Sequence, residues 1–284
     1  MRSLHPSTVG KLFVTGFTVG PIVDSLHNQC LLKYDMLPLS IEWPSSIIES
    51  RFLPPFVLEY TQQHPYLFCS SWTVPPLLGL AYVVLGALLP RLFETIRFGD
   101  QSFLSPRWKL LDPRDVSNIN GNDKKTAISM LRNNALLAVT TTALIIKLSE
   151  FLETHQSPTL TGEPTGVLWL LSAALTQWAI LDGSIAALLA ATITSIGGPL
   201  SELPFVAHGV WEYLDSSADY QPLQSLPLGN SMLEWVLGKN YPDLALSSIT
   251  GPCYFAVAMD AIALGRWFDA TKAGDVADSQ ERSS

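Results

Sequence analysis

Charged residues are scarce in this chain. Of its 284 residues, 15% are Asp, Glu, Lys or Arg, whereas 48% are hydrophobic. A soluble domain carries about 25% charged residues, so this chain has too little charge to cover a surface that faces water. The mean hydropathy of +0.25 agrees with this reading. The composition excludes an ordinary soluble domain and predicts an integral membrane protein.

The sequence motifs of common enzymes and metalloproteins are also missing. The three cysteines, Cys30, Cys69 and Cys253, are dispersed singly, which gives neither a disulfide framework nor a metal-ligand spacing. There is no P-loop, dinucleotide fingerprint, H-E-x-x-H or G-x-S-x-G motif. We therefore expect no catalytic residues, no metal, no cofactor and no nucleic-acid partner.

Long apolar runs, by contrast, recur along the chain. A membrane-spanning helix needs about 20 mostly apolar residues, and six segments fit this requirement. They are residues 9–31, 70–90, 127–147, 166–181, 185–205 and 245–264. The sequence thus predicts an all-α integral membrane protein, with a six-transmembrane-helix bundle over residues 1–268 and a disordered cytosolic tail over residues 269–284.

Lys and Arg are distributed unevenly between the predicted loops. If the N-terminus is cytosolic, only Lys33, Arg51, Lys147 and Lys239 of the 17 basic residues lie on the outer side. Cytosolic loops carry an excess of Lys and Arg, so both termini are predicted to be cytosolic. Two long outer segments, 32–69 and 208–244, are rich in Pro and aromatic residues. We expect them to lie along the membrane interface as short amphipathic pieces.

Ionisable groups inside apolar runs are costly in lipid, so each is a candidate functional group. Asp24 and His27 are three residues apart and share a helix face, either as a ligand-facing pair or as an interfacial helix end with a local hydrogen bond. Asp260 lies deep in the last span and must face the bundle or pair with a cation. Lys147 and Glu150 are one turn apart and predict an interfacial ion pair.

Two breaks in the apolar runs carry further predictions. Asp182 ends the fourth span, where a cap for the next helix is the simple interpretation. Pro75 and Pro76 fall in the first turn of the second span, where proline costs least. A proline kink there would widen a gap between helices, and Gly79 would form the floor of the resulting cavity.

Several of these stretches together resemble the Insig (insulin-induced gene) proteins. The run SSWTVPPLLGLAYVVLGALLPRLFE, residues 70–94, is similar to the second Insig span. Further matches are Arg132 and Lys147 in span three, Trp178 and Asp182 in span four, HGVWEY over residues 208–213, and the pairs Pro252-Cys253 and Gly265-Arg266 in span six. The resemblance is collinear from Val9 to Phe268.

The resemblance implies a function and a set of residues. It implies a multi-pass protein of the endoplasmic reticulum membrane, without catalytic activity, that binds an oxysterol or other lipid. Such a protein retains or regulates sterol-sensing-domain partners such as Scap, with its SREBP precursor, or HMG-CoA reductase. Asp182 is implied to bind the partner. The residues assigned to lipid binding are Trp72, Pro75, Pro76, Gly79, Thr140, Thr141, Asp24 and His27.

The sequence departs from the Insig pattern in several places, including an unmatched Gln near the start of span four and longer outer loops, and other functions stay open. The Asn-His pair of span three is replaced by VTTTALII, residues 139–146, and the turn after Asp182 lacks both arginines. One alternative is an isomerase-like lipid enzyme using Asp24, His27 and Asp260, but these residues are predicted at different depths. The other is a small lipid transporter, although the repeats typical of transporters are missing.

Overall fold

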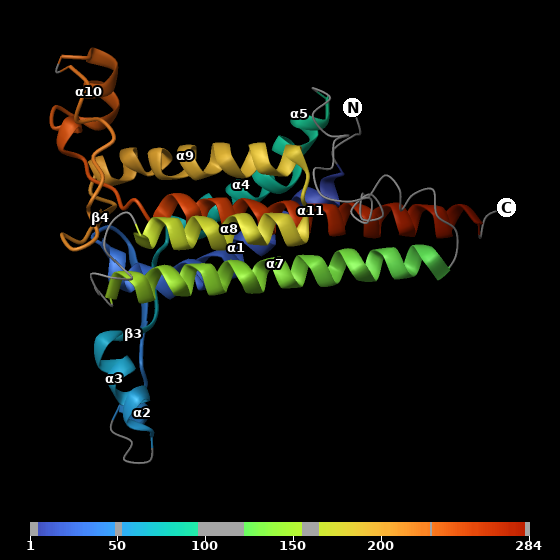
Figure 1. Cartoon of the computed structure of the whole chain (residues 1–284), viewed down its shortest axis with the longest axis horizontal. Helices are drawn as coiled ribbons and strands as arrows, with labels where there is room; N and C mark the ends of the chain where they lie inside the picture. Colours follow the sequence, from blue (N-terminus) through green and yellow to red (C-terminus); the bar gives the residue numbers. More distant parts are fainter. Residues whose placement is uncertain (1–4, 49–52, 96–121, 155–164, 228, 282–284) are drawn as a thin grey trace.

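The fold is mostly helical, with two short sheets at one end. A computed structural model describes residues 5–48, 53–95, 122–154, 165–227 and 229–281. Its long helices are α1 (Pro6–Leu31), α4 (Val74–Val83), α5 (Leu89–Thr95), α7 (Asn122–Thr154), α8 (Thr165–Leu181), α9 (Ile185–Ala207) and α11 (Thr250–Glu281). They lie side by side in a bundle, except for the seven-residue α5, which turns away from it (Figure 1).

Four helical stretches are long and apolar enough to cross a membrane. They are Pro6–Leu31, Val74–Phe93, Asp123–Thr154 and Ile185–Ala207, and α8 is a shorter apolar helix. Taking Val74–Phe93 as one stretch, the successive long helices run in opposite directions. Helix α1 therefore begins, and α11 ends, at the same end of the bundle (Figure 1). We call this the terminal end, and the opposite end, which carries the sheets, the hairpin end.

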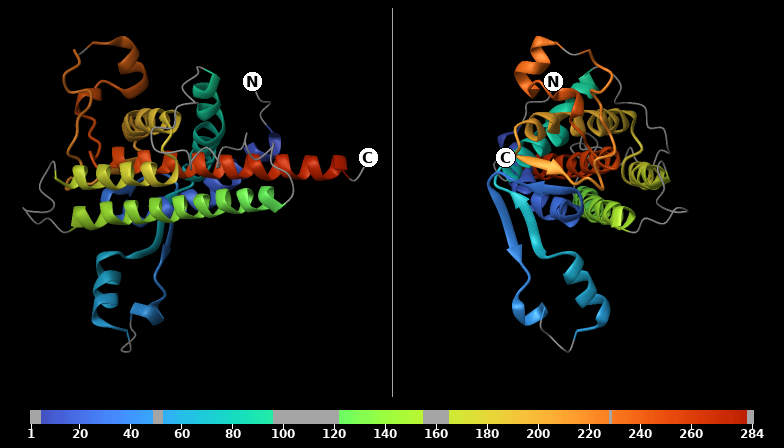
Figure 2. Two further views of the ribbon diagram at one scale, coloured as in Figure 1. Left: turned by 45° about the vertical axis from the view of Figure 1, so that its right-hand side comes forward. Right: turned by 90° about the vertical axis from the view of Figure 1, so that its left-hand side faces the viewer.

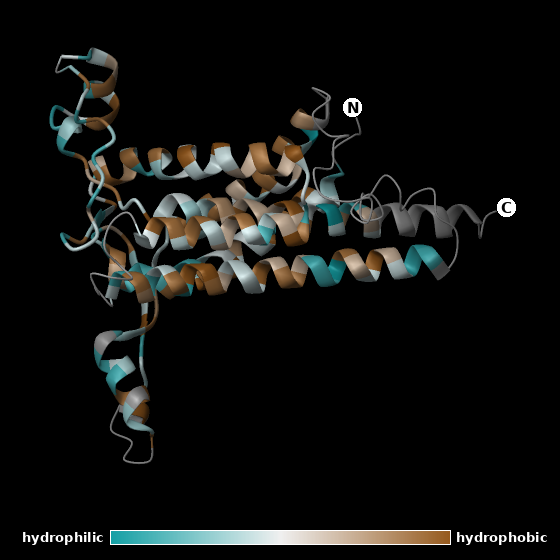
Figure 3. Cartoon of the chain, viewed as in Figure 1, coloured by the Kyte–Doolittle hydropathy of each residue, from teal (hydrophilic) through white to brown (hydrophobic). Residues whose placement is uncertain are grey.

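The bundle is organised around α11. Phe255, Ala256, Met259 and Ile262 of this helix are at most 2% exposed. Outward-facing apolar side chains remain uncovered, as in Leu144, which is 64% exposed. Figure 3 shows apolar residues along the bundle and polar residues gathered toward its ends. A surface this apolar is suited to lipid rather than to water.

The second span is irregular, but not at the prolines where the sequence predicted a kink. Pro75 and Pro76 occupy the first turn of α4, where a proline ring displaces no hydrogen bond. The irregularity lies further on, at the π-helical turn η1 (Val84–Leu88). There a Cβ atom on Gly86 would collide with the Ala261 carbonyl of α11, and one on Gly265 would collide with the Gly86 carbonyl. The irregular turn therefore lies where α11 is approached most closely, and the prediction of a kink at the prolines was wrong.

The last helix is longer than its predicted span. It begins at Thr250 rather than at 245 and continues to Glu281, through most of the segment 269–284 that was predicted to be disordered. Low hydrophobicity suggested disorder, but adding residues to a helix that has already formed costs little. The segment KAGDVADSQE contains no proline that would stop it.

The all-α prediction was wrong in the outer segments. Strand β1 (Leu32–Tyr34) pairs with β4 (Trp211–Tyr213), and β2 (Pro38–Glu42) pairs with β3 (Tyr66–Ser71), both antiparallel. The ribbon β2–β3 carries α2 (Ser45–Ile48) and α3 (Pro55–Gln63), whereas α10 (Ser231–Leu237) lies in the second outer segment. Figure 2 shows the ribbon with α2 and α3, here called the arm, and α10 projecting on opposite sides of the bundle. Strands of three to six residues are too short to give a clear alternating pattern.

Candidate functional site

A narrow cleft lies between α1, α4, α9 and α11 toward the hairpin end. Its volume is about 610 Å³, which includes the space where the cleft opens to solvent. Its apolar walls include Gly20, Val23, Leu78, Ile146 and Val257. Side chains of this kind suit the hydrocarbon part of a ligand.

Several polar side chains of α1 lie close together in this cleft. His27 Nε2 lies 4.0 Å from Asp24 Oδ1, and His27 Nδ1 is 2.9 Å from Ser149 Oγ of α7. The Asn28 amide donates to the Asp24 carboxylate and to the Tyr34 hydroxyl. Asp24 and His27 thus both line the cleft, and the hydrogen bond of Asp24 with Asn28 is a local one of the kind that the other alternative expected.

A second carboxylate faces the same cleft from α9. Glu202 accepts hydrogen bonds from Tyr213 and Tyr254, each with an O–O distance of 2.6 Å. All three residues line the cleft. Sequence reasoning missed them, although the rule that selected Asp24 also applies to Glu202, an ionisable residue within an apolar run. The two tyrosines gave no such signal.

The residues predicted in the second span lie outside the cleft. They are Trp72, Pro75, Pro76 and Gly79, and none of them is among its lining residues. A Cβ atom on Gly79 would lie 2.8 Å from the Phe13 ring, so this glycine lets α4 pack closely against α1. Leu78 and Tyr82 of α4 line the cleft instead. The face of α4 that lines the cleft is therefore the face of Leu78 and not that of its neighbour Gly79.

The two threonines of span three lie elsewhere again. Thr140 is exposed and donates to the Leu136 carbonyl. Thr141 lines a separate groove between α7 and α8, with an empty volume of about 870 Å³. Gln177 of α8 donates to Thr141 there. The predicted lipid-binding residues are therefore divided among several places, and only Asp24 and His27 line the cleft.

Asp182 lies in the turn between α8 and α9, at the terminal end. Its Oδ1 accepts the Ser184 backbone N–H at 2.9 Å, and its Oδ2 pairs with Arg266 of α11. The N-cap of α9 is Ser184, whose Oγ accepts from the Ala187 N–H. The carboxylate thus orders the turn and joins it to the central helix. The prediction that Asp182 caps α9 was wrong, because the N-cap is Ser184.

Asp260 is fully buried and faces the bundle, as predicted from its cost in lipid. Its Oδ2 accepts a hydrogen bond from Tyr82 at 3.1 Å. Tyr82 lines the cleft and Asp260 does not. Asp24 and His27 therefore line the cleft, whereas Asp260 contacts it through Tyr82.

Comparisons with known proteins bear on the fold. No family model matches the chain, and no curated protein matches it. Among solved structures the chain is similar to MvINS, a mycobacterial Insig homolog from Mycobacterium vanbaalenii. The identity is 17% and the TM-score 0.53, over 95% of this chain and 97% of that chain. A cross-linked MvINS trimer gives 18% identity with the same TM-score and coverage. The chain therefore has an Insig-like fold, as the pattern of residues along its spans predicted.

Proposed function

We propose that this chain is a membrane protein that binds a neutral, hydroxyl-bearing lipid in the cleft of α1, α4, α9 and α11. One observation carries the proposal: two carboxylates, Asp24 and Glu202, lie at the polar part of a cleft whose other walls are apolar. A ligand that fits needs an apolar body and a polar end that donates hydrogen bonds.

The charges narrow the class of lipid. Carboxylates accept hydrogen bonds, and two of them disfavour an anionic headgroup such as a phosphate. The hydroxyl of a sterol or of diacylglycerol satisfies both conditions. The Insig-like fold supports the same choice, because the resemblance of the spans implies binding of an oxysterol or another lipid.

The proposal extends to cellular role and orientation. The protein is a six-span regulator of sterol or lipid homeostasis in the endoplasmic reticulum membrane, with both termini cytosolic. It holds or regulates sterol-sensing-domain proteins of the Scap or HMG-CoA reductase type. The excess of Lys and Arg on one side and the terminal-end position of both α1 and α11 support this orientation.

Photo-crosslinking tests the lipid site. Val257 lines the cleft, so Val257→Phe should fill it and lower labelling by a sterol or diacylglycerol probe at least fivefold. Val14→Phe is the matched control, because Val14 is 59% exposed on the outer face and its substitution should leave labelling unchanged. Equal labelling of wild type and Val257→Phe, with both monodisperse in detergent, would contradict the proposed site.

Co-immunoprecipitation tests the partner assignment of Asp182. Asp182→Asn keeps the shape of the side chain but loses its charge-assisted bonds, so recovery of co-expressed Scap or HMG-CoA reductase should fall sharply. Because Asp182 pairs with Arg266 within the chain, the thermal stability of the variant is measured alongside. Undiminished recovery of both partners would leave Asp182 a purely intramolecular role.

A further inference from the structure

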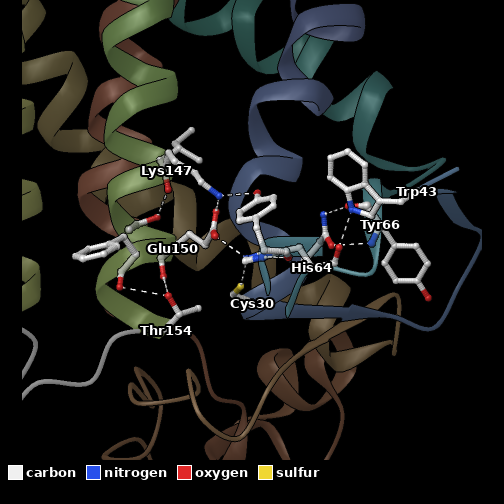
Figure 4. Close-up of polar contacts among 12 residues, drawn as sticks. Cys30, Trp43, His64, Tyr66, Lys147, Glu150 and Thr154 are labelled. Atoms are coloured by element: carbon white, nitrogen blue, oxygen red, sulfur yellow. Dashed lines mark hydrogen bonds and ion pairs between the residues drawn. The ribbon is translucent and has the colours of Figure 1, made fainter. Parts of the chain in front are cut away.

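Three potential metal ligands from distant parts of the sequence meet at the hairpin end. Cys30 lies at the end of α1, His64 follows α3 on the arm, and Glu150 lies near the end of α7. Cys30 Sγ is 3.4 Å from His64 Nε2, and His64 Nε2 is 2.6 Å from Glu150 Oε1. The three donor atoms all lie within 4.8 Å of one another. Figure 4 shows the side chains converging on one point.

The hydrogen bonds of His64 determine which nitrogen faces the cluster. Its Nδ1 is 3.0 Å from the Tyr60 backbone carbonyl oxygen. A carbonyl only accepts hydrogen bonds, so Nδ1 carries a proton and Nε2 points at Cys30 and Glu150. Histidines that bind metals typically donate their second N–H to a backbone carbonyl or a carboxylate in this way.

The surroundings hold the carboxylate in a fixed orientation. Glu150 is 3% exposed, and its second oxygen, Oε2, pairs with Lys147, the ion pair predicted from the sequence. The Lys147 ammonium also donates to the Tyr60 hydroxyl at 2.8 Å and lies 4.5 Å from the centre of the Tyr60 ring. Glu150 Oε1 is thereby left for the cluster, and a carboxylate ligand held by a second hydrogen bond is the usual arrangement at metal sites.

The cluster also has a metal-free form. Without a metal, His64 Nε2 lies 2.6 Å from Glu150 Oε1, close enough for the two atoms to share a proton in a hydrogen bond. A metal ion would replace that proton and the thiol proton of Cys30, and both would pass to solvent.

We propose that Cys30 Sγ, His64 Nε2 and Glu150 Oε1 bind a Zn²⁺ ion and leave its fourth position open to water. A thiolate, an imidazole and a carboxylate form a donor set that suits zinc. Tetrahedral donors at about 2.0–2.3 Å from zinc stand about 3.3–3.8 Å apart. The Cys30–His64 distance of 3.4 Å already lies in this range, and the Glu150 carboxylate has to move back by about 1 Å.

Zinc at this place would have a structural consequence. The three ligands belong to α1, to the arm and to α7, so the ion would tie the projecting arm to the bundle. Binding energy at a site assembled only by folding stabilises the fold that assembles it. The spacing of the ligands, 34 and then 86 residues apart in the sequence, explains why no motif indicates the site.

Zinc titration of the full, untagged chain in detergent tests the proposal. After chelator treatment and dialysis, we expect one equivalent of Zn²⁺ to bind in competition with a chromogenic chelator. Cys30→Ser and His64→Gln should each weaken binding by about 100-fold or more. Cys69→Ser is the matched control, since Cys69 is also a free, partly buried thiol and lies on the arm in β3, and this variant should bind zinc as the wild type does.

Cobalt gives a test that needs no variant. Co²⁺ bound by the wild-type chain should show the charge-transfer absorption of a thiolate ligand, and this band decides the matter if Cys30→Ser fails to fold. The proposal is overturned if the wild type binds no zinc, if its Co²⁺ form lacks that band, or if a folded Cys30→Ser binds zinc as tightly as the wild type.

Discussion

Two carboxylates at the terminal end of the bundle and two beside the cleft at the hairpin end have different kinds of partner. At the terminal end, Asp182 pairs with Arg266, and Asp269 pairs with Arg91 at 2.5 Å. At the hairpin end, Asp24 and Glu202 rely mainly on neutral donors, an asparagine amide and two tyrosine hydroxyls. In the described part of the chain, neither of these two forms an ion pair with Lys or Arg. Arginines thus pair with the two carboxylates at the terminal end, whereas the two carboxylates beside the cleft have no such cation.

The two kinds of carboxylate affect different properties: the stability of the fold and the binding of a ligand. An arginine that pairs with a buried carboxylate neutralises its charge and links the two segments that carry the pair. A carboxylate that accepts only from neutral donors has two oxygens and retains the capacity to accept from a ligand. We therefore expect loss of an arginine partner at the terminal end to change mainly stability, and substitutions at the cleft to change mainly lipid binding.

The largest effect is expected where the terminal-end pair is broken. Arg266→Met would leave the buried Asp182 carboxylate without its cation, at a cost of about 3 kcal/mol, the lower end of the range for buried pairs because Arg266 is partly exposed. Thermal unfolding in detergent, followed by tryptophan fluorescence, measures this. The double variant with Asp182→Asn should recover part of the loss. A single variant as stable as the wild type would remove the contrast between the ends.

A smaller effect, on binding rather than on folding, is expected at the cleft. Glu202→Gln keeps one acceptor oxygen but loses the charge, and a hydrogen bond to a charged group contributes about 1.5–3 kcal/mol. Labelling by a sterol or diacylglycerol probe should therefore weaken about tenfold or more. Glu212→Gln, an exposed glutamate of β4, is the control. If Glu202→Gln lowered the unfolding temperature as much as Arg266→Met, the cleft would be structural.

The smallest effect is expected at the exposed rim of the hairpin end. Lys33 forms ion pairs of 2.9 Å with Asp35 and Glu212, and their hydrogen bonds raise the pKa of Lys33. Because Lys33 is solvent-exposed, water and salt screen these pairs. Lys33→Met should leave both the unfolding temperature and probe labelling nearly unchanged. A marked loss of stability would show that the β1–β4 sheet depends on this cation.

Local patterns predicted the helices well. Apolar length is a property of consecutive residues, so the helices of the bundle could be located from hydropathy. The cost of a charge in lipid predicted that Asp260 faces the bundle, where it is fully buried. The short strands could not be found this way, since pairing such as Leu32 with Tyr213 joins residues far apart in the sequence.

The composition of the site depended on contacts that no local pattern contains. Gly79 and Leu78 are adjacent, and only the packing of α4 decides that Leu78 reaches the cleft while Gly79 meets Phe13. Likewise, nothing near Asp182 in the sequence indicates Arg266, its partner 84 residues away. The resemblance to Insig proteins predicted the fold, but it did not predict which side chains converge.

The lengths of α7 and α11 have a consequence at the terminal end of the bundle. At 1.5 Å per residue, the 33 residues of α7 extend about 50 Å, whereas the hydrocarbon core of a bilayer is about 30 Å thick. About 20 Å of this helix therefore stands clear of the hydrocarbon. Near its start, Ala127 and Leu131 pack against Ala270 of α11, and Figure 1 shows both helices extending past α8 and α9. The two helices therefore continue together beyond the rest of the bundle at the terminal end.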